Sequence, residues 1–255
     1  MPAWSVTPAV PTSSEVEALG AGAPTTVDPM SGYGQFCPVA KTSELLSERW
    51  MPLVLRELMV GSQRFGEIRN GIPTISTAML SKRLRQLELA GVVDKTPTGH
   101  GADYTLTEAG WELYPIIEAM GVWGQRWARS EYGPDELDPS LLMWDVRRMV
   151  QAGGLGDDRI VVEFAFRQAP PGKSRFWLVV DAAIDLCLVD PGHEVDLWVY
   201  ADLKALTQVW MGDRTMRKEL ADGTIEVSGR RDLVRAFPDW FGRHPILGGV
   251  ADARV

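Results

Sequence analysis

The sequence predicts a two-domain protein, with a mainly helical N-terminal domain that ends in a β-hairpin and a C-terminal α+β domain with a mainly antiparallel sheet. The chain has 255 residues, of which 45% are hydrophobic, and this is enough material for two cores. Residues 30–132 show helical periodicity followed by one hairpin, whereas residues 140–255 contain a series of short alternating strands. An acidic, proline-containing segment at 133–139 is expected to be the linker between them.

The first 29 residues are expected to be a disordered tail. Residues 1–29 are rich in Pro, Ala, Ser and Thr, carry no Lys or Arg and lack an apolar run, so they resemble neither a secretory signal nor a transit peptide. Met30 begins the first segment that we expect to fold. Translation could therefore start at Met1 or at Met30, and the sequence leaves both open. No stretch approaches the roughly 18 consecutive apolar residues of a membrane span, and two distant cysteines imply no disulfide framework. We therefore expect a cytoplasmic protein.

Four helices are predicted in the N-terminal domain before the hairpin. The segment CPVAKTSELLSERW contains the first, and RWMPLVLRELMVG contains the second, which is apolar nearly all round and should be buried. A third, short helix lies in QRFGEIRNGIP, where Gly71 and Pro73 end it. The fourth follows after this turn.

The fourth helix, residues 76–90, has two faces of opposite character. Leu80, Leu84 and Leu87 form a narrow apolar stripe, and Arg83 lies close enough to it to be structural. The opposite face suits the DNA major groove, because short side chains allow close approach while cations meet phosphates or guanine edges. A solvated face on a core helix would look the same, so this helix alone leaves both interpretations open. Its predicted DNA-binding residues are Ser76, Thr77, Ala78, Ser81, Lys82 and Arg85.

A hairpin directly after this helix favours the DNA-binding interpretation. Two short β-prone runs flank PTGHGA, whose proline and glycines favour a turn, and a hairpin after a recognition helix is a wing. Although the net charge of the chain is −8, the segment from Arg64 to Lys95 contains six basic and three acidic side chains. Arg64, Lys95 and His100 are therefore further predicted DNA contacts, although a lone loop histidine is more often merely solvated.

A long helix is expected from Thr107, whose hydroxyl can cap it, with a kink at Pro115. Its apolar stripe continues for roughly five turns and needs a partner. That partner is either the core of the chain itself or a second copy, in a two-fold dimer that spaces two recognition helices for a pseudo-palindromic operator. The predicted dimerisation residues are Leu113, Ile117, Met120, Trp123 and Trp127.

The order of these segments resembles the HxlR family of winged helix-turn-helix regulators, a branch akin to the MarR regulators. The resemblance extends roughly from Tyr33 to Tyr132 and rests on CPVAKTSELLSERW, LVLREL, QRFGEIRNGIPTISTAMLSKRLRQLELAGVV and YTLTEAGWEL. It implies a homodimer, a recognition helix at residues 76–90 and a wing at residues 94–104. Cys37 occupies a position at which some members carry a redox-sensing cysteine; the alternative is a small buried hydrophobe beside Pro38.

The C-terminal domain begins with a helix in LLMWDVRRMV and continues with four strands. The turns PPGK and DPGH are expected to connect antiparallel neighbours, and Asp202 is a plausible N-cap of the next helix. The predicted strands are residues 160–166, 175–180, 184–189 and 195–200, followed by a helix from 203, a helix at 215–221, a strand at 224–227 and a helix at 231–241.

Two segments of this domain, VDLWVYADLKALTQVWMGD and ELADGTIEVSGRRDLVRAFPDW, resemble the sterol-carrier-protein type of lipid-binding domain. The resemblance covers roughly Ser140 to Phe241 and implies an apolar tunnel between sheet and helices. The alternative is that the same side chains simply fill a core. The predicted ligand-binding residues are Trp144, Trp177, Trp198, Leu206, Trp210, Met211, Met216, Phe237 and Trp240.

These observations favour a transcriptional regulator, repressor or activator, whose binding to double-stranded DNA is modulated by an apolar small molecule or lipid in the C-terminal domain. The alternative is a lipid-binding protein in which the helix-turn-helix serves oligomerisation. An enzyme is not expected, because the chain lacks a GxSxG elbow, a phosphate loop, HExxH and CxxC, and we predict no catalytic residues. The three histidines stand alone, so we predict no metal and no cofactor.

Overall fold

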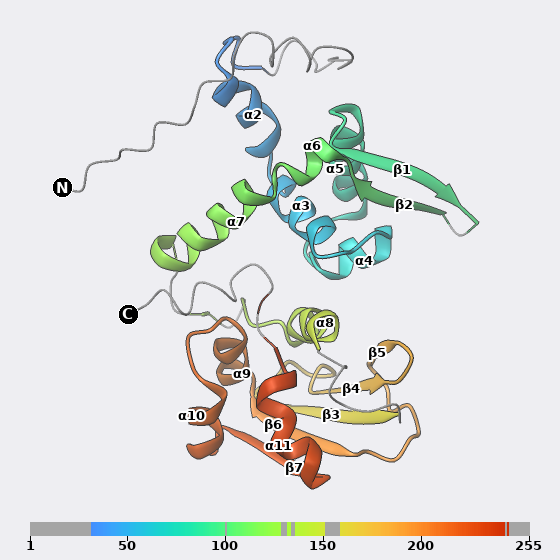
Figure 1. Ribbon diagram of the computed structural model, residues 1–255, viewed down its shortest axis with the longest axis vertical. Coiled ribbons are helices and arrows are strands. Elements are labelled where there is room, and N and C mark those ends of the chain that lie inside the picture. Colours follow the sequence, from blue (N-terminus) through green and yellow to red (C-terminus); the bar gives the residue numbers. More distant parts are fainter. Residues whose placement is uncertain are drawn as a thin grey trace, which may run out of the picture.

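The computed structural model describes residues 32–99, 101–128, 132–133, 136–150, 159–242 and 244 (Figure 1). The predicted tail, Met30 and the candidate contact His100 lie outside these residues. In the part of the chain that is described, no helix is both long enough and apolar enough to cross a membrane.

The N-terminal half contains a helix-turn-helix followed by a hairpin. In chain order its elements are α2 Pro38–Leu46, α3 Met51–Met59, α4 Phe65–Asn70, α5 Thr77–Leu89, β1 Val93–Thr98, β2 Gly101–Leu106, α6 Glu108–Trp111, α7 Tyr114–Trp123 and the π-helix η1 Gly124–Ala128. Helices α4 and α5 form the helix-turn-helix, and the antiparallel pair β1–β2 extends beyond it (Figure 1). The four predicted helices and the hairpin are therefore all present.

The core of this half forms around α3. Met51, Val54 and Leu55 of α3 are fully buried and pack with the predicted stripe of α5, in which Leu80 and Leu87 are also inaccessible to solvent. Burial of this stripe fixes which face of α5 points outward, because residues on a helix share a face only at spacings of three or four.

The predicted long helix after the hairpin is interrupted. Thr107 caps it as expected, with its hydroxyl accepting a hydrogen bond from Gly110 N–H at 3.2 Å, but α6 ends at Trp111 and α7 begins at Tyr114. Pro115 is the physical reason, since proline has no N–H for the helical ladder and is tolerated in the first turn of the new helix. The single long helix was wrong, whereas the expected disturbance at Pro115 was right.

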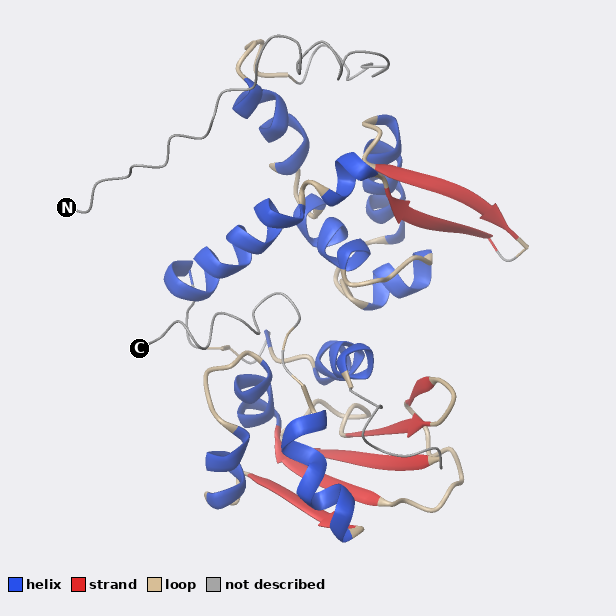
Figure 2. Ribbon diagram, in the orientation of Figure 1, coloured by secondary structure: helices blue, strands red, loops and turns tan. Residues whose placement is uncertain are grey.

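The C-terminal half is a five-stranded sheet with helices packed on one face (Figure 2). The strand order is β5-β4-β3-β6-β7, and all neighbours are antiparallel except β3 and β6, which are parallel. The elements are α8 Pro139–Met149, β3 Ile160–Arg167, β4 Arg175–Val180, β5 Ile184–Cys187, β6 Leu197–Asp202, α9 Leu203–Trp210, α10 Met216–Ala221, β7 Ile225–Gly229 and α11 Arg231–Trp240.

The parallel pair corrects one prediction. PPGK does connect antiparallel neighbours, but DPGH leads from β5 to a strand on the far side of β3. Sequence periodicity shows which side chains of a strand share a face of the sheet, but it does not show which strands lie beside it. The crossover could therefore not be predicted from the residues alone.

The two faces of the sheet differ as the alternation of β3 predicts. Phe164 and Val162 point into the core shared with α8, α9, α10 and α11. Val161 points to the opposite face, where it forms a separate small cluster with Trp177 and Val179.

Candidate nucleic-acid interface

Helix α5 presents a polar, basic face to solvent. Its N-cap is Ser76, whose hydroxyl accepts a hydrogen bond from Met79 N–H at 3.2 Å, and caps of this kind stabilise a helix by roughly 1 kcal/mol. The predicted contact residues Thr77, Ala78, Ser81, Lys82 and Arg85 are all exposed, as is Ser76.

Buried Arg83 fixes α5 to the segment before α3. Its side chain donates a hydrogen bond to the carbonyl oxygen of Arg49 at 2.8 Å and forms an ion pair with Glu48 at 2.6 Å. Arg83 is 3% exposed, whereas Arg85, two residues later, points to solvent. The two arginines therefore have different roles, and the structural role expected for Arg83 agrees with these contacts.

The base of the hairpin is tied to the start of α4. Tyr104 N–H donates to the carbonyl oxygen of Gln63 at 2.8 Å, and Arg64 lies 3.9 Å from Asp103 of β2. Lys95 on β1 is exposed, with its ammonium 5.9 Å from the centre of the Tyr104 ring directly across the pair. The wing therefore holds a fixed position relative to the helix-turn-helix.

Three exposed cations in this region have no carboxylate partner. Lys82, Arg85 and Lys95 form no ion pair with any residue that the structure describes, and Arg64 has only the long contact with Asp103. Unpaired cations on a helix and its adjacent wing suit contacts with phosphates and base edges of a duplex.

The predicted dimerisation residues divide into two groups. Ile117 is buried and Leu113 is partly buried against the core of the N-terminal half, so these two belong to the chain's own packing. Met120, Trp123 and Trp127 are exposed instead, Trp123 by 62% and Trp127 by 70%. Ile116 and Met120 also line an apolar groove of about 520 Å³ against α2.

Comparison with known proteins identifies the fold of this half. Residues 45–132 match the HxlR-like helix-turn-helix family. The uncharacterized HTH-type transcriptional regulator YvaP of Bacillus subtilis is 39% identical over 112 residues, which cover 42% of this chain and 95% of YvaP. The chain belongs to the HxlR-like helix-turn-helix family.

Further relatives match the same part of the chain. The uncharacterized HTH-type transcriptional regulator sll1512 of Synechocystis is 36% identical over 107 residues, which cover 41% of this chain and 79% of that protein. The solved structure of the reduced form of the transcriptional regulator YodB from B. subtilis is 34% identical in sequence. The match covers 37% of this chain and 97% of the YodB chain, with a TM-score of 0.33. These relatives are named as transcriptional regulators, and α4, α5 and the wing form the winged helix-turn-helix of this HxlR-like half.

Cys37 lies at the start of the HxlR-like half, as the N-cap of α2. Its thiol is free, and the residue is partly exposed beside Tyr33 and Val39 in a shallow groove. It is therefore not the fully buried hydrophobe that one interpretation expected.

The nine predicted ligand-binding residues do not line one cavity. Leu206 and Phe237 are fully buried, and the Phe237 ring packs 5.1 Å from that of Trp240. Trp177 on β4 and Trp198 on β6 both lie opposite Glu163 of β3, and residues paired across strands share a face of the sheet. Both tryptophans therefore point away from the helices, and Trp198 is 45% exposed there. The others are also dispersed: Trp210 and Met216 lie in the core with Leu206, Met211 contacts both cores, and Trp144 lines a cleft between the two halves.

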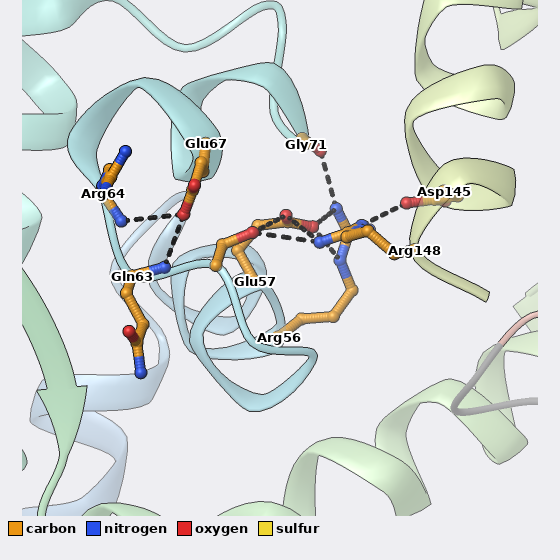
Figure 3. Close-up of polar contacts among 9 residues, drawn as sticks. Arg56, Glu57, Gln63, Arg64, Glu67, Gly71, Asp145 and Arg148 are labelled. Carbon is orange, nitrogen blue, oxygen red and sulfur yellow. Dashed lines mark hydrogen bonds and ion pairs between the residues drawn. The ribbon is translucent and has the colours of Figure 1, made fainter. Parts of the chain in front are cut away.

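A buried ion cluster joins the two halves, and sequence reasoning did not find it (Figure 3). Glu57 of α3 has no exposed surface and accepts hydrogen bonds from Arg56 at 2.8 Å, from Arg148 of α8 at 2.8 Å and from Ser62 at 3.2 Å. Arg148 also pairs with Asp145 one turn earlier in α8. We call these five residues the interdomain ion cluster.

Gly71 makes room for this cluster. Its carbonyl oxygen accepts a hydrogen bond from Arg56 at 2.8 Å, and a Cβ at this position would lie 1.9 Å from a carboxylate oxygen of Glu57. The backbone of Gly71 has an ordinary φ of −76°, so the requirement is for space and not for an unusual conformation. The turn between α4 and α5 is therefore packed directly on the interdomain ion cluster.

A second polar contact links the halves at η1. Gln125 is buried and donates hydrogen bonds to the carbonyl oxygen of Met211 and to a carboxylate oxygen of Asp213, both at 3.2 Å. The Tyr132 hydroxyl lies 3.4 Å from the other oxygen of Asp213. The helix that carries Trp123 and Trp127 is thus anchored to the C-terminal half as well.

Proposed function

We propose that this chain is a homodimeric transcriptional regulator that binds a pseudo-palindromic operator through α5 and the wing. The observation that carries the proposal is the pair Lys82 and Arg85, two exposed cations that form no ion pair with the described residues. They lie on a helix whose opposite side is held by buried leucines and Arg83. A rigid helix with one free basic face is what major-groove recognition requires. The regulator names of the HxlR-like relatives support the same function.

The proposed dimer interface is the exposed apolar face of α7 and η1. Met120, Trp123 and Trp127 lie on it, and such a face on a helix beside the DNA-binding domain favours a second copy of the chain as its partner. A two-fold arrangement would present two copies of α5 to successive major grooves. Leu113 and Ile117 would support this face from within the chain.

We further propose that residues 140–255 form a separate ligand-responsive domain, joined through 133–139. Its five-stranded sheet, with helices packed on one face, is consistent with a sterol-carrier-like fold. The contacts of Arg148 with Glu57 and of Gln125 with Met211 give this domain a physical route to the DNA-binding half.

The test is DNA affinity measured by fluorescence anisotropy on fragments selected from genomic DNA. The Lys82→Ala/Arg85→Ala variant should lose about 1–3 kcal/mol for each side chain that reaches a base edge, and its salt slope should fall by about one for each phosphate that it no longer neutralises. Arg217→Ala/Lys218→Ala removes the same charge from exposed positions on α10 and should bind as the wild type does. Wild-type affinity in the Lys82/Arg85 variant would exclude α5 as the recognition helix.

A further inference from the structure

A cleft of about 470 Å³ lies between the two halves of the chain, beside the interdomain ion cluster. One wall is formed by α4 and the turn after it, with Arg69 and Pro73, and the other by α8 and β5, with Trp144, Arg147 and Leu186. Figure 1 shows α4 and α8 facing each other across the two halves. The volume is in the range of small-molecule sites, which often occur at domain interfaces.

The walls of this cleft contain hydrogen-bond donors that the protein itself does not use. Trp144 contributes its ring to the wall, because its indole nitrogen has essentially no exposed surface and is not reached from the cleft. Arg147 donates only its Nε to the carbonyl oxygen of Ile184, at 2.8 Å, and neither Arg147 nor exposed Arg69 forms an ion pair within the described part of the chain. The remaining N–H groups of the two arginines favour a ligand that brings acceptors.

The cleft also contains two carboxylates, as many as it has guanidinium groups. The Glu67 carboxylate already accepts hydrogen bonds from the backbone N–H groups of Gln63 and Arg64, at 3.0 and 3.1 Å. Asp185 is the remaining carboxylate of the lining. Apolar surface comes from Pro73, Leu186 and the Trp144 ring, so the cleft combines an apolar wall with two guanidinium groups that form no ion pair with the described residues.

We propose that this interdomain cleft binds a small carboxylate with an aromatic or other apolar body. The carboxylate is held by the guanidinium groups of Arg69 and Arg147. The apolar body packs against Leu186 and the Trp144 ring. The ligand site is then between the domains, and not in the core of the C-terminal half, where Leu206 and Phe237 are packed together with other buried side chains.

A ligand in the cleft acts on DNA binding through residues that adjoin the interdomain ion cluster. This coupling rests on the proposed function. Arg147 precedes Arg148, which pairs with Glu57, and Arg69 lies two residues before Gly71, whose carbonyl accepts from Arg56. The ligand thus bridges α8 to the turn that leads into α5. It changes operator affinity only by the difference between its affinities for the free and DNA-bound conformations.

Isothermal titration calorimetry on the full chain with 2-naphthoate and its neutral counterpart 2-naphthamide tests the site. Loss of one charged hydrogen bond corresponds to about tenfold or more in affinity, so the amide should bind at least about tenfold more weakly than the acid. Arg147→Gln and Arg69→Gln should each weaken naphthoate binding to a similar extent. Arg231→Gln, at an exposed position on α11, is the matched control and should bind naphthoate as the wild type does.

The outcomes separate the two proposals. Equal binding of acid and amide, no binding of either at millimolar concentration, or unchanged binding in Arg147→Gln overturns the carboxylate site. Operator titrations with and without naphthoate then test the coupling, for which about fivefold or more is expected. Unchanged operator affinity at saturating naphthoate overturns the coupling. A chain that binds naphthoate but no DNA would instead refute the proposed regulator function.

Discussion

The interdomain ion cluster predicts a specific loss of stability when Arg148 is replaced by methionine. Arg148 and Glu57 are 2.8 Å apart, and at an effective dielectric constant of about 20 two unit charges at this distance attract by about 6 kcal/mol. Desolvation of the two ions, at several kcal/mol each, offsets most of this attraction in the intact pair. Removal of one partner is different, because the remaining charge stays buried.

The size of the loss follows from what Glu57 retains. In Arg148→Met the carboxylate keeps Arg56 and the Ser62 hydroxyl, so we expect a decrease of about 3 kcal/mol in the free energy of unfolding, the lower end of the range for broken buried pairs. Glu57→Leu leaves two guanidinium groups facing each other and should cost about 3–5 kcal/mol. The double variant should cost less than the sum of the two, because it removes both charges together.

Urea unfolding followed by both far-ultraviolet circular dichroism and tryptophan fluorescence measures these changes. We expect the two signals to coincide for the wild type and to separate in Arg148→Met, because the halves then unfold less cooperatively. Arg159→Met is the matched control: it breaks the exposed pair with Asp181 and should cost at most about 1 kcal/mol. Equal losses in Arg148→Met and Arg159→Met, or strict additivity in the double variant, would refute a buried cluster that joins the halves.

Three further changes have defined outcomes. Trp127→Glu should convert the proposed dimer to a monomer in sedimentation velocity and weaken operator binding, whereas Trp198→Glu, on the open face of the sheet, should leave that dimer intact. Ser76→Ala should lower the free energy of unfolding by about 1 kcal/mol in urea titrations, and an unchanged midpoint would contradict the cap. Burial and neighbouring arginines lower the pKa of His244 to about 4, so the unfolded chain binds the extra proton between pH 6.5 and 4. Stability is then complete above pH 6.5 and falls by about 3 kcal/mol as the pH drops to 4, and His244→Gln should flatten that fall.

The features that the sequence predicted well are those that depend on local periodicity. The stripe of Leu80, Leu84 and Leu87 determines which face of α5 is buried, and this is enough to place Lys82 and Arg85 on the free face. Caps and turns are equally local, since they depend on residues a few positions apart.

The features that the sequence did not predict depend on contacts between distant segments. Glu57 and Arg148 are 91 positions apart, and neither lies in a pattern that distinguishes a buried ion from a solvated one. The tryptophans show the same limit: Trp177 and Trp198 were grouped with Trp210 by residue type, but their parity on the strands puts them on the other face of the sheet. For Trp177 the face is set by the register of the β3–β4 pair, and for Trp198 by the register of the parallel pair that the crossover to β6 creates.

Helix α3 occupies one of the positions through which the two halves contact each other. Its apolar side, with Met51 and Leu55, packs with the leucines of α5, while Glu57 on the same helix is held by Arg148 of α8. A movement of α8 alone would leave the Glu57 carboxylate buried with one guanidinium fewer, which costs several kcal/mol unless water enters or α3 follows. Because the α3–α5 packing is close and apolar, a shift of α3 is transmitted to α5 and not absorbed between them. The carboxylate of Glu57 therefore makes the position of α5, the proposed recognition helix, depend on the position of α8.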